Sequence, residues 1–247
     1  MIRRADDIKG LAAQLDAQPF SNIYALAALA GYPADDRFYR AYAAGPGALV
    51  LCGGTAYPFL PPGAPAEEAA RFLQMQNARC AVGEEQTVRA LAAYMPGACI
   101  ETSRMLVLHG PAPSGTLRAR LCGRDAEAQV YGLLRACYGG LPDFQEYMDA
   151  KDQRRYYLGG RTAVCELDGR IVAAGAILCA TDRAALVGAL ACAPQYRGRG
   201  CARAVVRALY DAAGGRALCL LTGQALLPFY ARLGFQDLCA MAQLRIE

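Results

Sequence analysis

The sequence lacks the residues that several classes of protein depend on. It contains a single histidine, His109, so a metal site or a Cys–His pair would have to rest on that side chain alone. We expect His109 to lie at the end of a strand, and we expect no metal. The eleven cysteines are odd in number and include no C-x-x-C pair. This indicates free cysteines in a reducing, cytoplasmic compartment rather than a disulfide scaffold.

Long runs of one residue type are also missing. No stretch reaches about 18 uninterrupted apolar residues, so no membrane-spanning helix is predicted. The opening residues, MIRRADDIKG, mix charge with apolar side chains and do not read as a signal peptide. The net charge is only +4 and no Lys/Arg run occurs. We therefore expect neither a nucleic-acid partner nor a membrane partner.

What the sequence does contain is typical of a globular protein. Hydrophobic residues make up 55% and charged residues 19% of its 247 residues, enough for one large or two small domains. The segment HGPAPSGT, residues 109–116, has two prolines, two glycines and no periodicity, which favours a linker. It divides the chain into halves of similar size, which we place at residues 1–112 and 113–247.

The first half mixes predicted helices with short strands. Ser21 can cap a helix that buries Ile23 and Leu26, and Pro65 can open a second helix. The segment EEQTVRALAAYM predicts a third helix. GALVLCGG, RCAVG and CIETSRMLVL predict strands. This half predicts an incomplete layer of strands and helices without an obvious motif.

The second half has a clearer order of elements. Asp125 can cap a helix with Val130 and Leu134 on its inner face. TAVCELDGRIVAAGAIL predicts a hairpin around Asp168-Gly169, a strong turn dipeptide. A strand at residues 184–193 follows, then a glycine-containing turn and a helix from about residue 200 to 213, in which Arg203 and Arg207 face outward. ALCLL, PFYARLGF and LCAMAQLRI predict a strand, a short helix and a closing strand.

The glycine turn, APQYRGRGCARAVVRAL, is the most informative stretch. Gly198 and Gly200 allow positive φ angles and a close approach of ligand to backbone. The helix behind them offers unsatisfied N–H groups and a positive dipole end, and Arg197 and Arg199 add guanidinium donors. Together these predict a pyrophosphate site. The turn fits neither a P-loop nor G-x-G-x-x-G, and a tight turn with two solvated arginines is the alternative.

The surrounding residues favour the phosphate site. The pattern Gln195-x-x-Gly198-x-Gly200, placed between a strand and a helix, resembles the coenzyme A motif of the GNAT N-acetyltransferase superfamily. FYARLGF, which begins at Phe229, resembles a second motif of that family. The resemblance covers roughly residues 117–247. It implies an α/β protein with the GNAT fold, in which helices flank a mixed, mostly antiparallel sheet.

The first half looks like a degenerate copy of the same fold, as in two-part bacterial members of the superfamily. It contains no Gln/Arg-x-x-Gly-x-Gly pattern. The expected organisation is therefore a degenerate GNAT-like half at residues 1–112 and an acetyltransferase domain at residues 113–247.

The resemblance also implies roles for individual residues. Backbone groups of Leu190, Ala191 and Cys192 would pair with the pantetheine arm of acetyl-CoA, and one of their N–H groups would polarise the thioester. Tyr230 would protonate the departing thiolate. The other cofactor-binding positions implied are Gln195, Arg197, Gly198, Arg199, Gly200, Cys201, Ala202 and Gln224.

Four side chains have alternative roles. Tyr230 shares a helix face with Phe229 and Leu233 and can be a core residue. Cys201, at a helix N-terminus, can be a reactive thiol or simple packing. Tyr156 and Tyr157, beside Arg154 and Arg155, can line an acceptor groove or belong to a solvated, basic strand edge.

A general base is the missing part. Many family members carry a glutamate on the strand before the glycine turn, but AALVGALACA contains none. Asp143, Glu146, Glu166 and Asp182 are the nearby carboxylates, and the sequence does not choose among them. At pH 7 only about one in 2,500 lysine-type amines is neutral, against roughly one in seven α-amines. A missing base therefore favours acceptors of low pKa.

We predict an N-acetyltransferase that moves the acetyl group of acetyl-CoA to an amine by direct attack. Its acceptor is a small-molecule or peptide amine of unspecified identity, and the sequence leaves a homodimer open. One alternative is an acyltransferase of the same fold with another acyl-CoA or an aminoacyl donor. A non-catalytic coenzyme A sensor or interaction module is the other.

Overall fold

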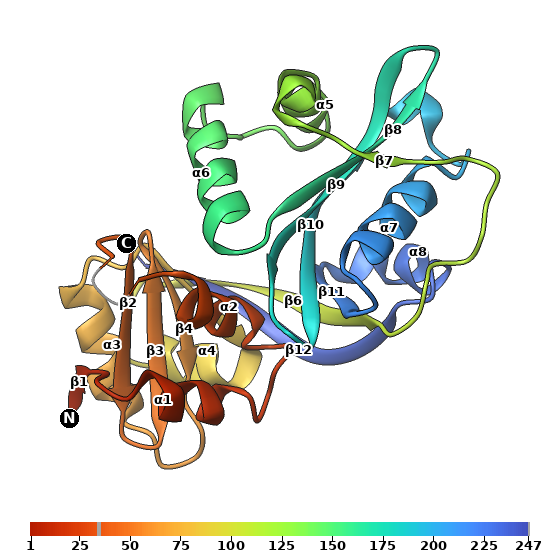
Figure 1. Ribbon diagram of the computed structural model, residues 1–247. Helices are drawn as coiled ribbons and strands as arrows, with labels where there is room; N and C mark the ends of the chain where they lie inside the picture. Colours follow the sequence, from red (N-terminus) through yellow and green to blue (C-terminus); the bar gives the residue numbers. More distant parts are fainter. Residues whose placement is uncertain (34–35, 247) are drawn as a thin grey trace. The chain divides into compact units, whose positions relative to one another are not determined.

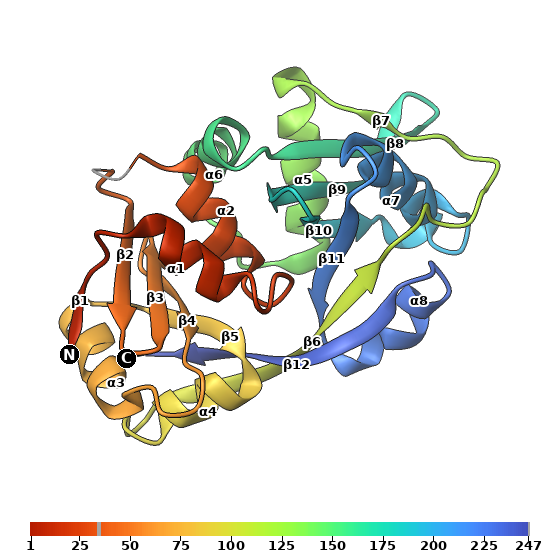
Figure 2. The ribbon, with the colours of Figure 1, turned by 60° about the horizontal axis from the view of Figure 1, so that its bottom comes forward.

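The computed structural model describes residues 1–33 and 36–246 (Figures 1 and 2). The chain divides into two compact units. The first contains Met1–Leu106, Leu221–Leu227 and the segment from Asp237 onward, and the second contains Val107–Leu220 and Pro228–Gln236. No helix in the described ranges is both long enough and apolar enough to span a bilayer.

The first unit starts with a strand and two helices, continues with three strands and then alternates helices with strands. Its elements are β1 (Ile2–Arg4), α1 (Ile8–Leu15), α2 (Ile23–Gly31), β2 (Tyr39–Ala44), β3 (Gly47–Cys52), β4 (Thr55–Phe59), α3 (Ala66–Met75), β5 (Cys80–Glu84), α4 (Glu85–Ala92) and β6 (Cys99–Leu108). Helices α1 and α2 cover one face of the strands, and α3 and α4 cover the other (Figure 2). The three strands predicted in this half are confirmed as β3, β5 and β6.

The rest of the chain repeats this order of elements. They are β7 (Arg120–Leu121), α5 (Glu127–Tyr138), α6 (Phe144–Tyr157), β8 (Arg161–Leu167), β9 (Arg170–Ala180), β10 (Ala184–Cys192), α7 (Cys201–Ala212), β11 (Ala217–Thr222), α8 (Leu227–Ala231) and β12 (Gln236–Arg245). Helix α7 packs on β8 and β9, and α5 packs on β9 and β10 from the opposite face (Figure 1). Both copies therefore run β-α-α-β-β-β-α-β-α-β.

The strands pair mostly in antiparallel fashion. The strand order is β1-β2-β3-β4-β5-β12-β6 in the first unit and β11-β10-β9-β8-β7 in the second. The β4/β5 and β10/β11 pairs are parallel. The predicted fold class, a mixed and mostly antiparallel sheet flanked by helices, is confirmed.

The last strand of the chain pairs with a strand of the first copy. Met241–Arg245 of β12 run antiparallel to Cys80–Glu84 of β5. Ala242 and Leu244 are fully packed in the core of the first unit, beside Leu49 and Leu73. The halves predicted at residues 1–112 and 113–247 divide the sequence between the two copies, whereas the compact units assign this strand to the first.

The hairpin between β8 and β9 forms as its turn dipeptide predicts. Asp168 and Gly169 have φ angles of 51° and 72°, and Leu167 pairs directly with Arg170. Positive φ at both central positions matches the right-handed twist of the flanking strands, and Asp-Gly tolerates it best.

Several local predictions were wrong. Asn22 occupies the N-cap position of α2 without a capping hydrogen bond from its side chain, and the Ser21 hydroxyl donates to Glu84. Asp125 lies inside a 3₁₀ turn, Arg124–Ala126, and the following helix begins at Glu127. Helix α6 was not predicted, because only Met148 of its residues is buried and no apolar stripe marks it. Its start is nevertheless well defined, since the Asp143 carboxylate accepts hydrogen bonds from the N–H groups of Gln145 and Glu146.

The predicted linker is bound to the second unit rather than free. Arg203 and Arg207 of α7 donate to the backbone carbonyls of Ser114 and Ala112, at 3.5 and 3.4 Å. Ala112 itself is buried. Segment 113–121 thus forms one wall of a cleft along α7.

Candidate active site

The centre of the candidate site is a strand that leaves its neighbour. Strand β10 pairs with β11 only from Ala184 to Leu186, but it pairs with β9 as far as Cys192. Among the described residues, residues 187–192 therefore pair with a strand on one side only. Their other backbone edge can accept an extended chain that carries amide groups, as an added strand would.

A β-bulge shapes this edge. The register with β9 shifts between Gly188 and Ala191, and Ala189 has a φ of 52°, which is uncommon for a residue with a side chain. The predicted pantetheine-binding residues lie at this bulge and just after it. The Leu190 carbonyl accepts a hydrogen bond from the Tyr138 hydroxyl at 2.6 Å. Ala191 is buried in a cluster with Val130 and other apolar residues of the second unit.

The strand then enters the glycine turn through a short 3₁₀ helix, Pro194–Tyr196. Gly198 and Gly200 have φ angles of 78° and 90°, as the sequence predicted for positions without a Cβ. Helix α7 begins at Cys201 with no side-chain cap and no acidic residue in its first turn. Its first N–H groups, including that of Ala202, therefore remain available to an anion.

The other predicted residues of this turn lie around that helix end. Arg197 donates its Nε to the Cys192 carbonyl at 3.3 Å and its backbone N–H to Pro194 at 3.2 Å. The guanidinium of Arg199 stacks over the Tyr196 ring at 5.3 Å. Gln195 is exposed.

Cys201 is a packed thiol. It is 1% exposed, and its Sγ contacts the Tyr196 carbonyl at 3.8 Å. Of the two roles that the sequence left open, this geometry favours packing.

A cleft of about 870 Å³ begins at the glycine turn and runs along α7. One wall carries Arg199, Arg203 and Arg207, and the opposite wall is segment 113–121, which includes Arg118. Asp211 is the acidic residue of the lining, and it pairs with Arg207 at 3.5 Å. The cleft is therefore strongly cationic and has the size of a cofactor site.

Tyr230 lies on α8 and is 8% exposed. Its ring packs edge-on against Phe229 and Phe235, at centroid distances of 5.0 and 5.7 Å. Burial, followed by the nearby Tyr138, raises the pKa of Tyr230 to about 12. The phenol therefore stays protonated at neutral pH, as an acid for a thiolate must, although the same packing also fits a core residue. Gln224 is exposed in the 3₁₀ helix Gln224–Leu226. This segment belongs to the first compact unit.

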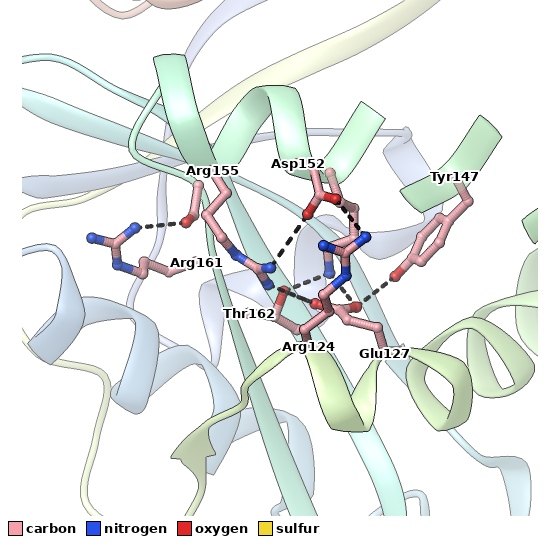
Figure 3. Close-up of polar contacts among 9 residues, drawn as sticks. Arg124, Glu127, Tyr147, Asp152, Arg155, Arg161 and Thr162 are labelled. Atoms are coloured by element: carbon pink, nitrogen blue, oxygen red, sulfur yellow. Dashed lines mark hydrogen bonds and ion pairs between the residues drawn. The ribbon is translucent and has the colours of Figure 1, made fainter. Parts of the chain in front are cut away.

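Helix α6 brings a cluster of charged side chains to β8 (Figure 3). The fully buried Glu127 carboxylate accepts hydrogen bonds from Lys151 at 2.7 Å, Arg155 at 3.1 Å, Tyr147 at 3.1 Å and Thr162 at 3.3 Å. Burial lowers the pKa of Lys151, against the opposing effect of Glu127. Burial, and then Glu127, raises the pKa of the Tyr147 phenol.

The position of Arg154–Tyr157 in α6 tests the two roles predicted for this segment, an acceptor groove and a solvated strand edge. Arg154, Arg155, Tyr156 and Tyr157 form the last turn of α6, so the predicted strand edge was wrong. Tyr156 is 82% exposed, whereas Arg154 and Arg155 line a small recess beside β9 and β10.

The four carboxylates predicted as possible bases are differently placed. Asp143 is used as the cap of α6, and Glu166 is paired with Arg120. Glu146 and Asp182 are exposed. None of the four side chains is buried.

The matching turn of the first copy has the opposite chemistry. Strand β4 also pairs with β5 over only two residues, Thr55 and Ala56. The turn that follows contains Pro61, Pro62 and Pro65, which lack N–H donors, and α3 carries Glu67 and Glu68 in its first turn. Missing donors and two negative charges disfavour an anion there.

Two residues of the site were missed in the sequence. Glu127 lies three residues before Val130 and seven before Leu134, on the buried face of α5. A carboxylate at a buried position of an apolar helix face needs a charged partner, so this pattern could have indicated a buried ion pair. Tyr138 precedes Gly139, which ends α5 with a φ of 63°. The residues around Tyr138 do not indicate its hydrogen bond to Leu190, which is 52 residues away in the sequence.

Known proteins share both the sequence pattern and the fold. Residues 158–237 match the family model described as "Acetyltransferase (GNAT) domain". A GCN5-related N-acetyltransferase from Kribbella flavida has a TM-score of 0.62 at 17% identity, with 96% of this chain and 95% of that chain covered. A GNAT-family acetyltransferase from Colwellia psychrerythraea has a TM-score of 0.59 at 15% identity, with both chains fully covered.

A third solved structure is named for a duplicated fold. It is a tandem GNAT protein from the clavulanic acid biosynthesis pathway, with a TM-score of 0.58 at 15% identity and coverage of 99% of this chain and 97% of that one. At these identities the structures establish the fold. No curated protein matches the chain. The family match shows a GNAT acetyltransferase domain at residues 158–237, and the solved structures share the fold of the whole chain.

Proposed function

We propose that the second copy is an acetyl-CoA-dependent N-acetyltransferase. One observation carries the proposal: the unpaired edge of β10 leads directly into a glycine turn at the uncapped N-terminus of α7. The family match supports acyl transfer in general, and this geometry supports coenzyme A as the carrier. A pantetheine arm has amide groups for the strand edge, and a diphosphate has negative charge for the helix end.

The cationic cleft supports the nucleotide end of the same ligand. Coenzyme A carries a diphosphate and a 3′-phosphate, and the cleft offers Arg199, Arg203 and Arg207 beside the glycine turn. The first copy supports no such ligand, because prolines and glutamates replace its donors. We therefore expect one acetyl-CoA per chain.

In the proposed reaction, the neutral amine attacks the thioester carbonyl carbon, and an N–H group near the β10 bulge stabilises the oxyanion. The C–S bond then breaks, and Tyr230 donates its proton to the thiolate. The proton lost by the amine returns through water to the tyrosine. The products are an N-acetyl amine and free coenzyme A, so atoms and charge balance.

The placement of the carboxylates supports one alternative function, a coenzyme A sensor. Because the four predicted bases are exposed, paired or used as a cap, a coenzyme A sensor without turnover has support too. Release of free thiol from acetyl-CoA, measured with a broad amine panel, separates the two functions. Turnover with any amine establishes the transferase. Tight binding of acetyl-CoA by calorimetry without turnover on any amine, or with other acyl-CoA donors, establishes the sensor.

A further inference from the structure

A small recess lies where α6 meets the β10 bulge, within the second unit. It has a volume of about 40 Å³, and its lining includes Tyr147 and Ala189. Ala189 is the strained residue directly before Leu190, so the recess adjoins the strand edge proposed for the thioester. A single water needs roughly 10–15 Å³ of such space, so the recess can hold a carboxylate-sized group but not a whole substrate.

The recess has more positive than negative charge. Its lining includes Lys151, Arg154, Arg155 and Arg161 and no carboxylate. Lys151 and Arg155 are already engaged by the buried Glu127, and Arg155 also lies 3.5 Å from Asp152. These contacts account for two of the four cations.

The other two cations have no such partner. Within residues 1–33 and 36–246, neither Arg154 nor Arg161 forms an ion pair. Arg161 donates only to the Gly160 carbonyl, at 2.9 Å, and Figure 3 shows its guanidinium directed away from Glu127. Arg154, one turn before the end of α6, lines the recess together with Tyr147 and Arg161.

We propose that this recess binds a carboxylate of the acceptor, so that the acceptors are amines that carry a carboxylate, such as amino acids. The inference rests on the proposed function. A planar carboxylate matches the paired donors of a guanidinium and fits the small volume. Binding it at Arg154 and Arg161 would hold the amino group of the same molecule over the neighbouring bulge.

The test compares matched amines in the thiol-release assay. The panel contains α-, β- and γ-amino acids, each beside its amide, with phosphoethanolamine beside ethanolamine. We expect kcat/KM to be at least about tenfold higher for the carboxylate of the best pair, since a hydrogen bond to a charged group is worth that much. The amides have the more acidic amino group and are more often neutral, so this preference would not arise from amine pKa.

Variants then link the preference to the recess. Arg161→Gln and Arg154→Gln should each lower the carboxylate-to-amide ratio about tenfold, and Arg161→Lys should restore part of it. Arg135→Gln, an equal loss of charge on the exposed side of α5, should leave the ratio unchanged. Equal use of carboxylates and amides, a stronger preference for phosphoethanolamine, or a ratio insensitive to both arginines would overturn the proposal.

A binding measurement keeps this proposal separate from the proposed function. Calorimetry with free coenzyme A present, and no acetyl group to transfer, should show tighter binding of the carboxylate than of the amide, and weaker carboxylate binding in Arg161→Gln. That result supports the recess even if no amine is acetylated, whereas equal binding of both overturns it even if some amine is.

Discussion

The Tyr138 hydroxyl donates a hydrogen bond of 2.6 Å to the backbone carbonyl of Leu190. This bond occupies a polar group on the strand edge where the pantetheine arm is proposed to bind. Tyr138 is 56% exposed, so its side chain can leave without disturbing a core. A ligand that pairs with this edge therefore competes with a hydrogen bond internal to the protein.

Tyr138→Phe should accordingly bind acetyl-CoA more tightly, by about two- to tenfold, because a net hydrogen bond is worth ~0.5–1.5 kcal/mol. Its folding stability should fall by a similar amount. Tyr131→Phe is the matched control, because it removes a tyrosine bond of 2.9 Å to the Pro142 carbonyl elsewhere on α5. It should lose stability without a change in affinity. Weaker binding by Tyr138→Phe would mean that the phenol contacts the ligand instead.

The glycine turn can be tested with a control that has the same backbone strain. Gly200 and Gly215 have φ angles of 90° and 83°, and an added Cβ would meet no atom within 4 Å at either position. Alanine at either site should cost ~1–2 kcal/mol of stability through the left-handed backbone. Only Gly200→Ala should also weaken acetyl-CoA, by about tenfold, because its Cβ would occupy the path of the diphosphate. Equal affinity for the two variants, measured by calorimetry, would remove the turn from the cofactor site.

How far the sequence predicts this protein depends on whether the signal is local. Asp168-Gly169 and the pair Gly198 and Gly200 predict backbone conformations that the turn itself imposes, and both predictions hold. Helix α6 escaped prediction because it packs through a buried ion pair and not through an apolar stripe. The unpaired edge of β10 and the Tyr138–Leu190 bond depend on residues far apart in the chain. No pattern in either segment encodes them.

The buried cluster on α6 makes a separate prediction about stability. Lys151→Met should destabilise the protein by ~3–5 kcal/mol, because it leaves the fully buried Glu127 with less compensating charge. The double variant Glu127→Gln with Lys151→Met should recover much of that loss, since no unpaired anion is left behind. Denaturant unfolding of the two single variants and the double variant gives the coupling energy. Additive losses would show that the pair is solvated and not coupled.

The pairing of β12 with β5 predicts that neither half folds well alone. A fragment of residues 113–247 exposes Met241, Ala242 and Leu244, all of which are buried in the intact chain. We expect it to aggregate, because an unpaired apolar strand is a template for association. Co-expression with residues 1–112 should restore solubility and acetyl-CoA binding. A soluble, fully active fragment 113–247 would show that the strand has another stable position.

The raised pKa of Tyr230 makes a prediction about the pH dependence of the rate. Its pKa of about 12 lies above the unfolded value near 10, so the phenol remains protonated throughout the physiological pH range. The stability that this protonation contributes is present below pH ~10 and is lost as the pH rises through the folded pKa. As a general acid, Tyr230 would therefore cause no fall in rate below pH ~10. Turnover should rise with pH up to the pKa of the amine, because the four candidate carboxylates are exposed, paired or used as a cap.

Tyr230→Phe should lower kcat by about 10²- to 10⁴-fold and kcat/KM equally, with acetyl-CoA affinity nearly unchanged, because a general acid acts only in the transition state. The ring contacts with Phe229 and Phe235 survive in this variant, so a purely structural role predicts nearly normal turnover. Tyr210→Phe, on α7, controls for the loss of a phenol as such. A rate for a high-pKa amine that levels off near pH 6.5 would contradict this mechanism, because it would reveal an enzymic base.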